Sequence, residues 1–132
     1  MVIKAVVCTL DNLPLLKEQI QILRREPIDE IVVVNNGSRD GTREWLDELE
    51  DKGDLVIVHR ENLGAGPGRN AGLDAAGKFD YVLMLDGGIR PLIGGVAIMR
   101  DYLERHPDVD VVSPEIATCC LLYTSPSPRD RS

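Results

Sequence analysis

The sequence predicts a three-layer α/β/α sandwich built on a mainly parallel β-sheet. Short apolar segments rich in Val and Ile recur at residues 3–7, 31–34, 55–58, 81–85 and 109–112. They are continuous rather than alternating, which is typical of strands buried on both faces of a parallel sheet. Helical patterns separate them, and strand–helix–strand units of this kind are connected by right-handed crossovers.

Each interval between strands carries a helical pattern whose apolar residues we interpret as core. The second helix is expected to begin after Ser38 or Asp40 as its N-cap, and the third is rich in Ala, which suits close packing on the sheet. In chain order the four stripes are Leu13, Leu16, Ile20 and Leu23; Trp45, Leu46 and Leu49; Ala71, Ala75 and Ala76; and Val96, Met99 and Leu103.

Size and composition indicate one domain of 132 residues, 43% of them hydrophobic. The net charge of −7 argues against a general nucleic-acid binder, which needs a basic face. The three cysteines show no metal-ligand spacing, and we recognise neither a signal peptide nor a membrane span. These features predict a cytoplasmic location.

The last residues, "CCLLYTSPSPRDRS", break the strand–helix alternation. The part "CLLYTSPSPRD" resembles a translated sequencing adapter, which places the end of the native sequence near Cys119. An ordinary disordered Pro/Ser tail is the alternative. We therefore expect a partial domain at 1–118, incomplete at its C-terminus, and a non-native or disordered tail at 119–132.

Polar residues follow each predicted strand. Open α/β sheets bind ligands beyond the carboxyl ends of their strands, so these residues are candidates for one site. A glycine-rich segment, "NLGAGPGRNAGLDAAG", adds Arg69, whose guanidinium suits a diphosphate. Each residue alone is also explained as part of a turn, and only their coincidence at one edge predicts a site. The strand-end residues are Thr9, Asp11, Asn12, Asn35 to Ser38, His59 to Asn62, and Asp86 to Gly88.

Several phosphate-binding motifs are absent or incomplete. No glycine follows the first strand, where "CTLDNLP" stands, and no Gly-Lys-Ser/Thr occurs. The segment "RDGT" is similar to part of the haloacid dehalogenase signature. That chemistry needs an Asp directly after the strand, where Asn35 and Asn36 stand instead, and Asp40 lies too far along. This class stays a minor alternative.

Four segments together, "VVCTLDN", "IVVVNNGSRDGT", "NLGAGPGRNAGLDAA" and "YVLMLDGGIRP", resemble the family 2 glycosyltransferases over residues 2–116. The resemblance implies the nucleotide-sugar-binding, Rossmann-like GT-A fold. It also implies transfer of a sugar from a nucleoside diphosphate sugar to the hydroxyl of a saccharide, lipid or protein acceptor. Such chemistry serves cell-surface polysaccharide biosynthesis, in the cytoplasm or at the inner face of the membrane.

The resemblance also implies roles for five residues. Thr9 and Asp11 would lie beside the base, Asn35 would contact the base edge, and Arg69 would face the nucleotide and diphosphate. Asp86 would be the first carboxylate of the Asp-x-Asp motif, near the ribose and a Mg²⁺ or Mn²⁺ ion.

The sequence departs from the family at three positions: Leu10 replaces a frequent Tyr, Asn35 a usual Asp, and Gly88 the second metal-binding Asp. The last change weakens the metal site. Asp86 with phosphate and water oxygens could still suffice, a group elsewhere could complete the site, or cationic side chains such as Arg90 could replace the metal.

No general base is identified. Glu115 comes too early in the pattern, and His59 and His106 are expected in surface or loop positions. We expect the base beyond this segment, so that the fragment alone is inactive. The alternative function is a non-catalytic nucleotide-sugar-binding or scaffold domain.

Overall fold

The computed structural model of the chain describes residues 1–86 and 88–111. Strands and helices alternate strictly, as predicted. The chain divides into two compact units, residues 1–97 and 98–132, and the first contains the whole sheet. The elements are β1 (Ile3–Thr9), α1 (Leu13–Leu23), β2 (Glu30–Asn35), α2 (Thr42–Glu48), β3 (Leu55–His59), α3 (Ala65–Ala76), β4 (Tyr81–Asp86) and α4 (Gly95–Arg105).

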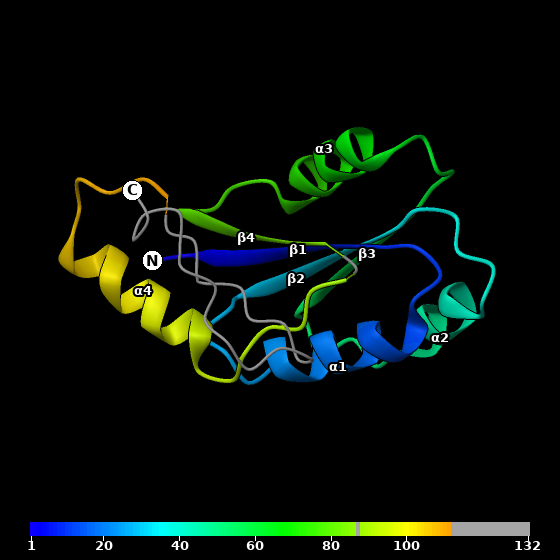
Figure 1. Cartoon of the computed structure of the whole chain (residues 1–132), viewed down its shortest axis with the longest axis horizontal. Helices are drawn as coiled ribbons and strands as arrows, with labels where there is room; N and C mark the ends of the chain where they lie inside the picture. Colours follow the sequence, from blue (N-terminus) through cyan, green and yellow to red (C-terminus); the bar gives the residue numbers. More distant parts are fainter. Residues whose placement is uncertain (87, 112–132) are drawn as a thin grey trace, which may run out of the picture. The chain divides into compact units, whose positions relative to one another are not determined.

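The described strands form one parallel sheet in the order β3-β2-β1-β4. Helix α3 covers one face, and α1 and α2 cover the other (Figure 1). The predicted three-layer architecture is confirmed. The register pairs Thr9 with Asn35, Asn35 with His59, and Cys8 with Asp86, so the four carboxyl ends meet at one edge.

The strands are buried on both faces, as their continuous apolar runs predict. Ala5, Val7 and Val33 pack with Leu16 and Ile20 of α1. On the opposite face a second cluster unites Val6, Cys8, Val32 and Val34 with Ala76 of α3. Each Val, Leu or Ile removed from water contributes about 1.5–3 kcal/mol, so these two layers are the main source of stability.

Two glycines let α3 lie close to the sheet. A Cβ at Gly72 would stand 2.4 Å from Val6 Cγ1 and 3.1 Å from Val34 Cγ2. A Cβ at Gly68 would stand 2.7 Å from Nδ2 of Asn36. Because a Cβ at Gly72 would overlap Val6 in the middle of β1 and crowd Val34 near the end of β2, α3 packs directly on both strands.

The predicted strand at 109–112 is wrong for the residues that are described. Residues 109–111 belong to no strand, and Val111 is 81% exposed. The Val109 N–H instead donates to the His106 carbonyl in a turn after α4. A Val-rich run becomes a strand only beside a partner. Val112, Glu115 and the tail lie outside the described residues. Within residues 1–86 and 88–111, no helix has the length and apolar character to cross a bilayer.

Candidate functional site

Arg69 of α3 and Asp86 at the end of β4 form an ion pair at the sheet edge. The Arg69 Nη2 lies 3.0 Å from Oδ1 and 2.8 Å from Oδ2 of Asp86. Both side chains are about half exposed. Two of the predicted site residues, 17 positions apart in the chain, are thus brought into contact where a ligand can reach them.

Asp11 is fixed to the loop that follows β2. Its N–H donates to Ser38 Oγ at 3.0 Å, and its Oδ1 accepts the Arg39 N–H at 2.6 Å. Its φ of 50° is the one positive value recorded for a non-glycine residue in the described chain. Asp tolerates this left-handed conformation better than most residues, and such backbone strain is concentrated at functional sites.

Thr9 and Asn35 lie beneath the surface rather than on it. Each is only 2% exposed, and they are register partners at the ends of β1 and β2. Asn35 Oδ1 accepts the Ser38 N–H at 3.1 Å, and its Nδ2 faces His59 Nδ1 at 3.2 Å. Thr9 Oγ1 is buried without a hydrogen-bond partner among the described residues. The five predicted residues therefore form an exposed level, Arg69, Asp86 and Asp11, above a buried pair.

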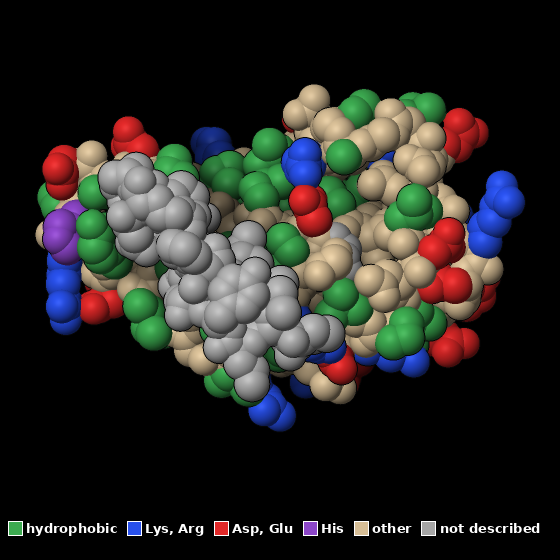
Figure 2. Space-filling view, viewed as in Figure 1, with side chains coloured by type: hydrophobic (Ala, Val, Ile, Leu, Met, Phe, Trp, Pro, Cys, Tyr) green, Lys and Arg blue, Asp and Glu red, His purple; other side chains and the backbone are tan. Residues whose placement is uncertain are grey.

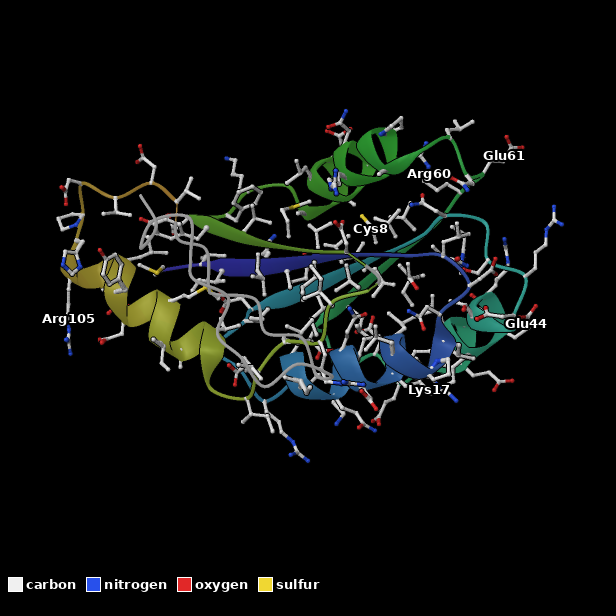
Figure 3. The ribbon with its side chains drawn as sticks, in the orientation of Figure 1. Cys8, Lys17, Glu44, Arg60, Glu61 and Arg105 are labelled. Carbon is white, nitrogen blue, oxygen red and sulfur yellow. The ribbon has the colours of Figure 1, made fainter. Side chains whose placement is uncertain are left out.

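The end of β1 lies in the electric field of the ion pair. Burial raises the pKa of the Cys8 thiol, the charge of Asp86 raises it further, and the charges of Arg69 and Arg60 lower it. Cys8 lies at the end of β1 under α3, and Arg60 lies on the loop between β3 and α3 (Figure 3). Local charges of both signs therefore act at this edge of an acidic protein.

His59 was predicted at a strand end but expected in a surface or loop position; it is instead a mostly buried residue of the strand itself. It is the last residue of β3, its side chain is 18% exposed, and it bridges Asn35 and Asp47. Its role as a partner of Asn35 follows from the register of β3 with β2, which only the structure shows. His106 is exposed in the loop after α4, as predicted.

Gln19 of α1 was also missed, and it supports the turn after β4. This fully buried side chain donates from Nε2 to the carbonyls of Asp86, at 3.1 Å, and Ile89, at 2.5 Å. The Ile89 N–H closes the turn onto the Asp86 carbonyl at 3.2 Å. A polar residue inside the apolar stripe of a helix is the sequence signal for such a role. Gln19 therefore fixes the backbone that carries Asp86.

The described residues do not build a metal site by themselves. Asp86 is engaged by Arg69, and a Cβ at Gly88, the position predicted to align with the family's second carboxylate, would meet nothing within 4 Å. Arg90 is paired with Glu18 at 2.6 Å. In the part of the chain that the structure describes, no three His, Cys, Asp or Glu side chains could hold an ion together.

Among the described residues visible in Figure 2, Lys and Arg side chains stand among Asp and Glu rather than in one basic patch.

The sequence profile described as Glycosyl transferase family 2 matches residues 5–126. The chain belongs to this family, and the resemblance carried by the four motifs is confirmed. Curated relatives agree: a poly-beta-1,6-N-acetyl-D-glucosamine synthase of Staphylococcus aureus is 36% identical over 58 residues, which are 43% of this chain and 14% of that protein. The putative glycosyltransferase EpsH of Bacillus subtilis is 34% identical over 76 residues, 54% of this chain and 22% of that protein.

Solved structures show the same fold. The crystal structure of S. aureus TarS 1-349 matches with a TM-score of 0.64 and 20% identity, over 81% of this chain and 33% of that one. The predicted GT-A architecture is thereby confirmed. The chain spans a third or less of the length of each of these proteins.

Proposed function

We propose that this chain is the donor-binding part of a glycosyltransferase that moves a sugar from a nucleoside diphosphate sugar to an acceptor hydroxyl. The observation that carries the proposal is the Arg69–Asp86 pair at the carboxyl edge of a parallel sheet, in a chain of glycosyl transferase family 2. Open α/β sheets bind their ligands at this edge.

We assign one set of roles to the exposed residues of the site and another to the buried pair beneath them. Arg69 binds the diphosphate, and Asp86 lies near the ribose. Asp11 lies beside the base, and Thr9 and Asn35 form the floor on which the base edge rests. The hard step of the reaction is departure of the nucleoside diphosphate, because negative charge develops on its leaving oxygen. A positioned guanidinium stabilises that charge without any covalent chemistry.

Members of this family commonly use a divalent cation, which supplies charge stabilisation at the diphosphate when bound. Asp86 is the one residue of this chain to which we assign such an ion, with Gly88 removing the usual second ligand. The general base that deprotonates the acceptor is proposed to lie C-terminal to residue 118 in the longer enzyme.

The names of two relatives support a proposal for the acceptor. One is named a poly-beta-1,6-N-acetyl-D-glucosamine synthase and another a putative glycosyltransferase. We therefore propose that the acceptor is a growing saccharide and that the enzyme takes part in cell-surface polysaccharide formation. We also propose that it works on the cytoplasmic side, and in the longer protein at the inner face of the membrane.

A non-catalytic nucleotide-sugar-binding or scaffold domain is the second candidate. Gly88 favours it, because loss of the second metal-binding carboxylate is an expected mark of lost turnover. This candidate keeps donor binding and differs only in catalysis.

Calorimetric titration of the chain with UDP, GDP, ADP and CDP, with and without Mn²⁺, tests donor binding. Asp86→Ala should weaken the binding of the preferred nucleotide in Mn²⁺, whereas Asp74→Ala, the same charge change at an exposed position of α3, should not. Binding of none of the four nucleotides would contradict both candidates. In the longer protein, donor turnover that Asp86→Ala abolishes supports the enzyme, and binding without turnover supports the scaffold.

A further inference from the structure

A chain of hydrogen bonds runs from α2 across two strand ends to the loop that begins α1. Asp47 Oδ1 lies 3.0 Å from His59 Nε2, and His59 Nδ1 lies 3.2 Å from Asn35 Nδ2. Asn35 Oδ1 accepts the Ser38 N–H at 3.1 Å, and Ser38 Oγ accepts the Asp11 N–H at 3.0 Å. We propose that His59 is a positioning residue of the nucleotide site: as a neutral ring protonated on Nε2, it sets the orientation of the Asn35 amide and hence the position of the loop that holds Asp11.

The positions of the protons follow from the chemistry of the partners. The Ser38 backbone N–H can only donate, so the Asn35 atom beside it is the carbonyl oxygen. The amide nitrogen therefore faces His59 Nδ1, which must accept. A neutral imidazole that accepts at Nδ1 carries its proton on Nε2, where the Asp47 carboxylate is available to accept it.

This arrangement explains why an amide stands at position 35. A carboxylate there would accept on both oxygens, so His59 Nδ1 would need a proton as well. Both ring nitrogens would then face carboxylates, and a neutral ring has only one N–H, so one of the two hydrogen bonds would be lost. Asn35 and neutral His59 are therefore complementary, because the amide donates a hydrogen bond where the ring nitrogen Nδ1 accepts one.

The pair acts on the ligand through the loop after β2. Asn35 and Ser38 form a local side-chain turn, a common way for Asn to fix the backbone three residues on. The same loop binds Asp11 twice, through Ser38 Oγ and the Arg39 N–H. The functional half of this inference rests on the proposed function, because it takes Asp11 as part of the nucleotide site. The tautomer of His59 does not depend on it.

Nitrogen NMR of histidine-labelled protein tests the tautomer directly. The chain has two histidines, and the second is an internal reference, because His106 Nδ1 lies 2.9 Å from the Tyr102 carbonyl and must donate to it. At neutral pH we expect a proton on Nε2 of His59 and on Nδ1 of His106. In Asn35→Asp, where Nδ1 faces an acceptor, the signal of a proton confined to Nε2 of His59 should be lost. A proton on Nδ1 of His59 in the unsubstituted protein would overturn the inference.

Two conservative variants test the effect on binding. In His59→Asn the side-chain oxygen takes the place of Nδ1 and can still accept from Asn35, whereas His59→Gln reaches only toward Asp47. With UDP, GDP, ADP and CDP as probes, His59→Asn should retain the affinity for the preferred nucleotide, and His59→Gln should lose about fivefold, the effect of one neutral hydrogen bond. Amide NMR spectra check that both variants are folded. Equal nucleotide affinities in two folded variants would overturn the positioning role of His59. If the unsubstituted chain binds no nucleotide, the proposed function fails while the NMR result still decides the tautomer.

Discussion

Arg69 and Asp86 are joined by one guanidinium nitrogen, Nη2, which lies within 3.0 Å of both carboxylate oxygens. Half-exposed pairs of this kind contribute about 0–1 kcal/mol to stability, because water screens them and two long side chains must be ordered. The pair therefore costs little to break. It holds the Arg69 guanidinium at the sheet edge, where an anionic ligand can replace Asp86 at little cost in stability.

Removal of that guanidinium should weaken nucleoside diphosphate binding. Charge-assisted hydrogen bonds contribute about 1.5–3 kcal/mol, so Arg69→Ala should raise the Kd roughly ten- to hundredfold in EDTA, as measured by calorimetry. The control is Arg43→Ala, which removes the same charge from an exposed position of α2. Equal losses in both variants would point to long-range charge and contradict a direct contact.

Restoring the second carboxylate of the Asp-x-Asp motif should strengthen a metal-dependent contribution. Nothing lies within 4 Å of a Cβ at Gly88, so Gly88→Asp has room for its side chain. Mg²⁺ and Mn²⁺ prefer oxygen ligands, and a second carboxylate should tighten nucleotide binding in Mn²⁺ with no gain in EDTA. Gly88→Asn, which adds a neutral side chain of the same size, is the matched control. Affinity in Mn²⁺ that is unchanged in Gly88→Asp would show that the residue is not aligned with the motif.

The sequence was sufficient for the sheet because continuous Val and Ile runs have few other uses. It failed at 109–111, where the same composition ends in a turn from His106 to Val109. Local β-propensity cannot tell whether a partner strand is present, and pairing decides whether such a segment becomes a strand.

The site could be predicted as a location but not as a set of contacts. Asn35 and Asp86 each end a predicted strand, and parallel strands have their carboxyl ends at the same edge of the sheet, so both residues could be placed at that edge. That Asn35 is buried and paired with His59 follows from the register of β2 with β3, which a single sequence does not reveal. Gln19 was missed because its partners, two backbone carbonyls of the turn after β4, are distant in the sequence.

Close packing of α3 predicts opposite effects for two glycines of the same helix. Gly72→Ala would place a methyl group 2.4 Å from Val6 Cγ1, so the free energy of unfolding should fall by about 1–3 kcal/mol. Gly66→Ala meets nothing within 4 Å and should stabilise the helix by about 0.4–1 kcal/mol. Urea unfolding measures both. A Gly72→Ala variant as stable as Gly66→Ala would contradict the close contact of α3 with β1.

The Asp40 carboxylate makes the stability of the folded protein depend on pH in the acid range. Its Oδ1 accepts from the Thr42 hydroxyl and N–H, and its Oδ2 accepts the Leu13 N–H at 3.1 Å, so one carboxylate joins the starts of α1 and α2. The hydrogen bond from the Thr42 hydroxyl is the largest cause that holds the pKa of Asp40 below 3.8.

Because its pKa is lowered by folding, Asp40 stabilises the protein above its unfolded pKa, and that stabilisation is lost as the pH falls through the folded value. Asp40→Asn replaces an accepting oxygen with a donor, so it should be less stable than the unsubstituted chain at neutral pH, and the difference should shrink below pH 3.8. Urea unfolding across this range, with Asp74→Asn at an exposed position of α3 as the charge-matched control, measures it. A difference for Asp40→Asn that stays constant with pH would show that the charge of Asp40 does not stabilise the two helix starts.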